Sequence, residues 1–286
     1  LFQCFLYLCD HQSLTKMMRR LKMIRIAVSV LFLVASILYA VVGSPAVASL
    51  AADVQISLSL MSVSIGVTLF WVVATFFLGR VYCSSVCPLG TLIDGIIRLT
   101  RPGRARRSFA YRHARRFRFD VVLIYAVGIV FGIGVTTIML EPWQVFRNLV
   151  GVWYPSQGEA IALHLGVGTV TGLICGIVSL LTIVITAYLR GRMWCNEICP
   201  IGICLSAVAS RSQMRIEIDP DKCINCMKCE EGCKSECIKV VSRYVDNSRC
   251  VRCFSCISSC PNDAIRYQSG RNRVSTPMMK RVDSPS

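Results

Sequence analysis

Eight cysteines near the carboxyl end of the chain form two runs with the same spacing. The pattern C-x2-C-x2-C-x3-C occurs twice, and each cysteine of the second run follows its counterpart by 27 residues. Thiolates are soft, anionic donors that suit iron, and the short gaps let a tight loop direct three sulfurs to three corners of a cube. The runs therefore predict bound iron–sulfur clusters. They comprise Cys223, Cys226, Cys229 and Cys233, followed by Cys250, Cys253, Cys256 and Cys260.

This spacing resembles that of bacterial two-cluster ferredoxins, in which three cysteines of a run hold one [4Fe–4S] cube and the fourth ligates the other. The resemblance implies that Cys223, Cys226, Cys229 and Cys260 hold one cluster, and that Cys250, Cys253, Cys256 and Cys233 hold the second. Proline follows Cys260, but Lys234 follows Cys233. Cys237 is a rival for the fourth ligand of the second cluster. It aligns with Ala264 across the 27-residue offset, which favours packing beside a cluster.

Zinc and disulfides are the alternatives for these cysteines. Zinc sites usually combine two close pairs of ligands separated by a longer spacer, and two unbroken runs of four fit that pattern poorly. Disulfides need an oxidising compartment, whereas the charge distribution described below places this segment in the cytoplasm.

A second set of cysteines belongs to a repeated twelve-residue motif. Gly-Arg-x-Tyr-Cys-x3-Cys-Pro-Leu-Gly begins at Gly79 and recurs, with Trp and Ile replacing Tyr and Leu, at Gly191, an offset of 112 residues. The prolines disfavour the α conformation at the preceding cysteine and suit the first turn of a new helix. Apolar residues then recur at helical spacing. We expect each copy to end a membrane helix and to begin a short amphipathic helix along the cytoplasmic interface. The motif cysteines are Cys83, Cys87, Cys195 and Cys199.

These four cysteines predict a redox or metal role, although buried cysteines often serve only as small apolar residues. If the two copies meet, four thiolates would form one soft site for iron–sulfur or copper(I); otherwise each pair acts as a dithiol. Arg80 and Arg192 precede the pairs by three residues and are expected to lower the thiol pKa values. Cys175 and Cys204 are expected to pack.

The composition indicates a membrane protein with basic flanks. The chain has 286 residues, 54% of them hydrophobic and 17% charged, with a net charge of +16. A soluble domain has about 25% charged residues. Four apolar segments are long enough, or nearly so, to cross a ~30 Å hydrocarbon core as helices. They are Ile26–Gly43, Ser57–Gly79, Val121–Leu140 and Ala160–Leu189.

The first segment is preferred as an uncleaved anchor over a signal peptide, although residues 46–48 resemble a cleavage site. Its apolar run is long, and the 112-residue repeat needs it as an opening helix. Met17 is the more natural start, so residues 1–16 are expected to be an upstream extension of the reading frame.

Lys and Arg fix the expected orientation. In a four-helix topology, 31 of the 32 positive charges fall on one side; the exception is Arg147. Both termini, the motif cysteines and the ferredoxin-like runs are therefore expected in the cytoplasm, with the chain in a bacterial or archaeal cell membrane. Both halves then start on the same side, as parallel repeats do. The positive-inside rule also explains the Arg run at 101–118, so no nucleic-acid partner is expected.

The expected fold is an α-helical membrane protein, four transmembrane helices in two parallel repeats, with a C-terminal α+β two-cluster ferredoxin domain. The domain boundaries follow from the motifs and the charge runs. They are an N-terminal segment (1–25), a first two-helix repeat (26–99), a basic loop (100–119), a second repeat (120–211), the ferredoxin domain (212–268) and a basic tail (269–286).

The repeated motif followed by a double ferredoxin run resembles the NapH/MauN-type membrane ferredoxins, and more broadly the NosR and CcoG proteins. The resemblance covers roughly residues 18–268. It implies an electron carrier that takes electrons from the membrane quinol pool and passes them through two [4Fe–4S] clusters to a redox protein of unknown identity. Such a carrier would be a quinol dehydrogenase component or an electron-transfer subunit. Lys234 departs from the pattern, which leaves the partner open.

Two other functions stay open: a maturation factor that reduces a metal or cofactor through the motif thiols, and an anchor subunit of a larger reductase. Glu141, Glu159 or His164 could accept a proton from quinol, although solvated acids beside an aromatic belt are the favoured interpretation. The chain has three histidines and no C-x-x-C-H, so haem is not expected.

Overall fold

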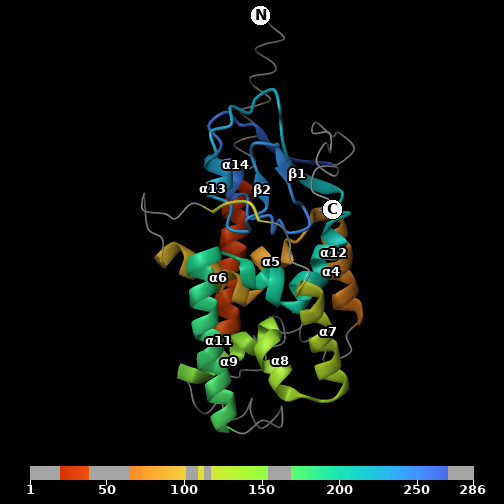
Figure 1. Cartoon of the computed structure of the whole chain (residues 1–286), viewed down its shortest axis with the longest axis vertical. Helices are drawn as coiled ribbons and strands as arrows, with labels where there is room; N and C mark the ends of the chain where they lie inside the picture. Colours follow the sequence, from red (N-terminus) through yellow and green to blue (C-terminus); the bar gives the residue numbers. More distant parts are fainter. Residues whose placement is uncertain (1–19, 39–64, 101–108, 113–116, 154–168, 270–286) are drawn as a thin grey trace, which may run out of the picture.

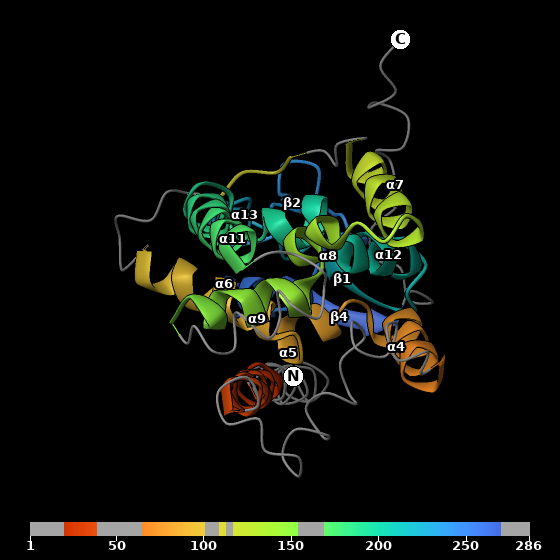
Figure 2. The same ribbon diagram turned by 90° about the horizontal axis from the view of Figure 1, so that it is seen from below.

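The structure is a computed structural model that describes residues 20–38, 65–100, 109–112, 117–153 and 169–269. Helices form most of the molecule, and a small α+β unit, residues 212–269, caps one end (Figure 1). We call this cap the ferredoxin unit. Figure 2 shows the same arrangement from the far end of the helices.

The helical part consists of an N-terminal helix, Arg20–Leu38, and of eight labelled helices and one π-helical turn. These are α4 (Ile65–Leu78), α5 (Tyr82–Ser85), α6 (Pro88–Thr100), α7 (Phe117–Val130), α8 (Gly134–Leu140), α9 (Pro142–Trp153), α11 (Thr169–Arg190), the π turn η2 (Trp194–Ile198) and α12 (Pro200–Ala209).

One helix among the described residues, Arg20–Leu38, is long and apolar enough to cross a membrane. Shorter apolar helices are found at Ile65–Leu78, Ile174–Arg190 and Pro200–Ala209. Parts of the first, second and fourth expected spans lie outside the described residues. The four-helix membrane topology and its two parallel repeats therefore stay a prediction.

The third expected span is broken, and the prediction of one continuous helix over Val121–Leu140 is wrong. The chain turns between α7 and α8 at Gly132, whose φ is +66°, a conformation that glycine adopts without steric cost. The two helices then pack together where Gly128 meets Thr136; a Cβ on Gly128 would lie 2.1 Å from the Thr136 hydroxyl.

The following stretch, expected as an outer loop over 141–159, is helical as far as Trp153. Helix α9 packs against α11 and α6. From Pro142 to Leu149 it is buried except at the half-buried Arg147, so its polar residues Gln144 and Asn148 are buried as well as its apolar ones. Its amphipathic pattern was present in the sequence, but a hydropathy scan passes over a helix that mixes polar with apolar residues.

The helices expected after Pro88 and Pro200 are confirmed, because α6 and α12 begin at these residues. Cys199 is extended, with ψ 117°, and its side chain accepts a hydrogen bond from the Gly202 N–H. However, α12 is not a surface helix as expected. It packs against α4, α7 and η2, and seven of its ten residues are buried.

The ferredoxin unit has two antiparallel strand pairs, β1 (Met214–Ile218) with β4 (Ile265–Ser269) and β2 (Ile238–Lys239) with β3 (Tyr244–Val245). Short helices α13 (Lys228–Glu231) and α14 (Ser255–Ser259) follow equivalent cysteines. Six non-glycine residues have positive φ at matching places, 27 residues apart. They are Asn225 and Arg252, Met227 and Phe254, and Glu236 and Asp263. The two loops therefore share one backbone shape.

Gly90 allows helix α6 to approach the preceding cysteine turn. A Cβ at this residue would lie 2.2 Å from the Cys83 carbonyl oxygen, whereas a Cβ at Gly95, on the same helix, would meet nothing within 4 Å. Gly202 stands in the same relation to the Cys195 carbonyl oxygen, at 2.1 Å.

Gly90→Ala should destabilise the protein by about 1–3 kcal/mol, because the added methyl group displaces backbone in a packed core. Gly95→Ala is the matched control and should be neutral, or stabilising by up to about 1 kcal/mol, through helix propensity. The midpoint of thermal unfolding in detergent, followed by far-ultraviolet circular dichroism, measures both. Equal midpoints for the two variants would contradict the close approach.

Candidate iron–sulfur sites and the cysteine layer

A cavity in the ferredoxin unit is lined by the four cysteines that the ferredoxin resemblance groups together, Cys223, Cys226, Cys229 and Cys260. We call it the first cluster site. Three of the cysteines come from one loop, and the fourth comes from the far end of the other run. Cys226 is exposed, and Ile224 beside it is 61% exposed. This site therefore lies close to solvent.

A second cavity is lined by the other predicted set, Cys233, Cys250, Cys253 and Cys256. We call it the second cluster site. Three of its four cysteines are buried, and Cys253 is half-buried. Cys237 also lines it, and its sulfur lies 3.5 Å from that of Cys233. Cys237 is 1% exposed, in agreement with a packing role next to a ligand.

The donor set of each cavity fits an iron–sulfur cube. No group of three or more His, Cys, Asp or Glu side chains in the described ranges is arranged to hold a single metal ion. A cube distributes its four cysteine ligands over four irons, so its sulfurs need not converge on one point as zinc ligands do. Four thiols around each of two cavities therefore suit two cubes better than two zinc ions.

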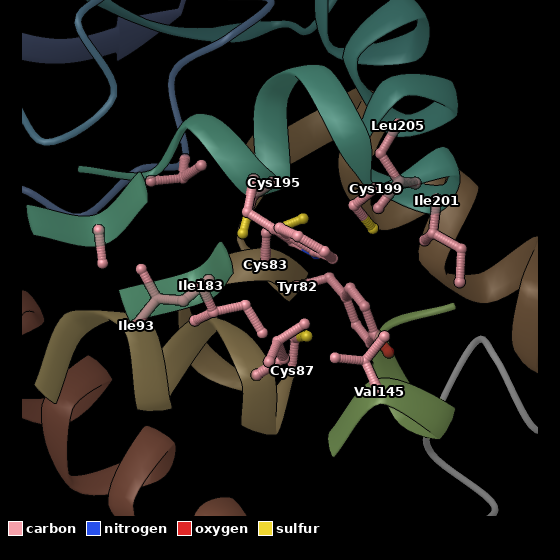
Figure 3. Packing of buried hydrophobic residues seen from close by; sticks show 14 of the residues in the cluster. Tyr82, Cys83, Cys87, Ile93, Val145, Ile183, Cys195, Cys199, Ile201 and Leu205 are labelled. Carbon is pink, nitrogen blue, oxygen red and sulfur yellow. The ribbon is translucent and has the colours of Figure 1, made fainter. Parts of the chain in front are cut away.

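The four motif cysteines lie together in one buried apolar cluster with Tyr82, Trp194 and Ile183 (Figure 3). We call this region the cysteine layer. It extends to the ferredoxin unit, because Val251 belongs to the same cluster and Cys253 packs against it. The layer brings both copies of the motif together, but the cysteines are not arranged around a single ion. The layer comprises Cys83, Cys87, Cys195 and Cys199 with their apolar neighbours.

Two buried arginines connect the copies reciprocally. Arg80 of the first copy donates to the Cys195 carbonyl oxygen at 2.8 Å and to Asn196 Oδ1 at 2.6 Å. Arg192 of the second copy donates to the Cys83 carbonyl oxygen, also at 2.8 Å. Each arginine follows a glycine with positive φ, Gly79 at +80° and Gly191 at +60°. The first half of the motif is therefore a turn that sends an arginine into the other copy.

The expected effect of these arginines on the thiols is wrong for three of the four cysteines. Burial raises the pKa of Cys195 to about 11, although Arg192 and Arg80 act in the opposite direction. Burial likewise raises the pKa of Cys87 and of Cys199 well above the usual thiol range. Desolvation disfavours the thiolate. The guanidinium groups mainly face backbone oxygens and polar side chains, although Arg80 also donates to the Cys83 sulfur at 3.8 Å. Cys204, expected to pack, is exposed, whereas Cys175 is buried as expected.

Asp94 is a buried, ion-paired residue next to the cysteine layer that the motifs did not single out. On helix α6 its carboxylate forms ion pairs with Arg192 at 2.8 Å, Lys234 at 3.2 Å and Arg25 at 3.7 Å. The cations hold the pKa of this carboxyl well below its usual range, against the effect of burial. The sequence did contain a signal, because Asp94 is the single acid among ten arginines between residues 80 and 119.

Glu141 is buried rather than solvated, so the expectation of exposed acids is wrong for this residue. It precedes α9 and is 1% exposed, and Trp143 and Gln144 beside it are buried as well. Glu159 and His164, the other candidate proton acceptors, lie outside the described residues.

The raised pKa values predict slow alkylation of the cysteine layer. At a pKa of about 11, about one Cys195 thiol in three thousand is ionised at pH 7.5. Burial also raises the pKa of Cys204, but this residue is exposed. N-ethylmaleimide at this pH should therefore modify Cys204 first and leave the buried Cys87, Cys195 and Cys199 unmodified. Peptide mass mapping of the folded, cluster-containing protein measures this. Rapid modification of Cys195 would contradict a buried, neutral thiol.

The comparisons with known proteins cover the four motif cysteines and the second ferredoxin-like run. A family model described as a 4Fe–4S binding domain matches residues 59–107 and 173–218, and a second model with the same description matches 243–266. The ferredoxin-type protein NapH of Haemophilus influenzae is 28% identical over 155 residues, 54% of this chain and 47% of that protein.

NapH of Escherichia coli is 26% identical over 156 residues, 54% of this chain and 47% of that protein. The putative electron transport protein YccM of Escherichia coli is 23% identical over 171 residues, 58% and 44% of the two chains. The chain thus spans about half the length of these relatives. No solved structure matches. The chain thus contains 4Fe–4S binding domains and is similar to the ferredoxin-type NapH proteins.

Proposed function

We propose that this protein is a membrane-bound electron carrier that takes electrons from quinol and passes them, through two [4Fe–4S] clusters, to a redox protein. The observation that carries the proposal is the pair of cavities, each lined by four thiols, three from one run and one from the other. The clusters would supply one-electron redox chemistry. The chain supplies the ligands Cys223, Cys226, Cys229 and Cys260 at the first site, and Cys250, Cys253, Cys256 and Cys233 at the second.

The two sites differ in ways that suit an input and an output. The second cluster site lies against the cysteine layer, through Val251 and Cys253. The first cluster site opens to solvent beside Cys226 and Ile224. Electrons arriving from the helices would reach the second site before the first, and a partner protein would dock where Cys226 is exposed.

Exposed apolar side chains support contact with lipid. Leu69, Phe70, Ile174 and Leu181 on α4 and α11 are each more than half exposed. Exposing such apolar side chains to water is unfavourable, whereas contact with the hydrocarbon chains of lipid is not. We propose a multi-pass membrane protein with its termini and ferredoxin unit in the cytoplasm, as the distribution of Lys and Arg favours.

The buried Glu141 is our candidate for the group that accepts a proton from quinol. It lies at the start of α9, which packs against α6, the helix that follows Cys87. A carboxyl group inside an apolar region is suited to proton exchange with a bound quinol.

The competing maturation role, in which the motif thiols reduce a metal or cofactor, is less well supported. Such chemistry needs accessible thiolates. All four motif cysteines are buried, and burial raises the pKa of at least Cys87, Cys195 and Cys199.

Anaerobically purified protein should contain about eight irons and eight acid-labile sulfides per chain, as two cubes require. Cys226→Ser should damage one cluster and Cys253→Ser the other, each halving the iron content. Cys204→Ser is the matched control and should leave it unchanged. Tight zinc without labile sulfide would exclude the assignment.

A quinol analogue should reduce the clusters of the protein in lipid vesicles, as followed by electron paramagnetic resonance. Glu141→Gln should slow this reduction more than tenfold, because a neutral amide cannot accept the proton, and reduction by dithionite should be unaffected. If dithionite reduces the clusters and the quinol analogue does not, the protein is a docking subunit or takes electrons from another donor.

A further inference from the structure

A buried ion cluster lies between the cysteine layer and the ferredoxin unit. Its centre is Asp94, whose carboxylate is within 3.7 Å of nitrogen atoms of Arg25, Arg192 and Lys234. The side chains are 12%, 6%, 0% and 7% exposed, respectively. We call this group the Asp94 ion cluster.

The ion cluster joins four separate segments of the chain. Arg25 belongs to the N-terminal helix and also donates to the Ser84 carbonyl oxygen at 3.0 Å. Asp94 belongs to α6, and Arg192 lies in the turn after α11. Lys234 follows Cys233, a predicted ligand of the second cluster site, and its carbonyl oxygen accepts from the Arg192 N–H at 2.8 Å.

The charges of this group do not balance. Three cations surround one carboxylate, which leaves two positive charges in excess. The nearby acids Glu197 and Glu236 are paired with Arg190, at 3.7 and 3.6 Å. Burying unpaired charge is costly, so a further negative charge is expected close to the group.

The second cluster site lies where that charge is needed. Arg25, Arg192 and Lys234 each interact electrostatically with the sulfur of Cys253. Lys22, whose ammonium donates to Ser258 Oγ at 2.7 Å, faces Cys253 and Cys256 as well. A [4Fe–4S] group with four thiolate ligands carries net negative charge in both oxidation states, and more when it is reduced.

On the basis of the proposed function, we propose that the Asp94 ion cluster sets the reduction potential of the second cluster site and leaves the first site unaffected. Net charge near an iron–sulfur group is one of the factors that fix its potential. The excess positive charge stabilises the reduced form, so the site beside the cysteine layer is held ready to accept electrons. Lys234 occupies the position that corresponds to the proline after Cys260. It supplies one of the three positive charges of the ion cluster.

Redox titration with chemical mediators, followed by electron paramagnetic resonance, tests the proposal on the full-length protein. Lys234→Gln should lower the midpoint potential of one cluster and leave the other unchanged. Asp94→Asn should raise the potential of the same cluster. Electrostatic control predicts that the midpoint potential shifts in opposite directions when opposite charges are removed. Loosening of the structure would instead shift the potential of both variants in the same direction.

Two further variants keep the test decisive. Lys239→Gln is the control on the same unit, because its ammonium lies 5.9 Å over the Tyr111 ring, and it should shift neither potential. If Asp94→Asn does not fold, Lys22→Gln, at the surface, should still lower the same potential by less than Lys234→Gln does.

The identity of the shifted signal is checked in ligand variants. The shift caused by Lys234→Gln should persist in Cys226→Ser and disappear with the signal lost in Cys253→Ser. Equal shifts of both clusters, or no shift, would overturn the proposal. Because mediators replace quinol here, failure of quinol oxidation leaves this result interpretable, and absence of iron would instead refute the cluster assignment itself.

Discussion

The complete burial of two guanidinium groups is the constraint on which the rest of the helical part depends. Arg80 and Arg192 are both 0% exposed. A buried, permanently charged group must find hydrogen-bond acceptors or a counter-ion. Each arginine finds a cysteine carbonyl oxygen of the other motif copy, and this requirement can be met only if the two turns face each other. The copies are therefore held together by charge, and apolar packing fills the remaining space.

Several features of the motif follow from that arrangement. Gly79 and Gly191 provide the positive φ that directs each arginine inward. Gly90 and Gly202 remove the Cβ atoms that would strike the accepting turns. The same turns also carry the ferredoxin unit, because the Arg192 N–H donates to the Lys234 carbonyl oxygen at 2.8 Å and the Asn196 amide donates to the Ser235 carbonyl oxygen at 3.4 Å. The iron–sulfur sites and the helices are thus fixed relative to each other through the motif.

The sequence was informative where a feature depends on local spacing. The resemblance of the cysteine spacing to that of two-cluster ferredoxins predicted which four thiols line each cavity, and Pro88 and Pro200 predicted where two helices begin. It was uninformative where the feature is tertiary. A hydropathy window measures length and polarity, so it could not detect the turn at Gly132 within an apolar stretch. The partners of Asp94 come from three distant segments, and no local pattern specifies them.

Three of the four motif thiols have raised pKa values although buried arginines lie in the same motif. Proximity of an arginine lowers a thiol pKa only when its field outweighs the loss of hydration, and at Cys195 burial prevails. The cysteine layer is then neutral at physiological pH for the three thiols whose pKa is raised, and those thiols contribute no negative charge to the cations beside them. The excess charge of Arg25, Arg192 and Lys234 has to be balanced from the ferredoxin side, where Cys253 is packed against the layer. Because these three motif thiols are neutral, they do not offset the positive charge of the ion cluster. That charge therefore acts on the second cluster site.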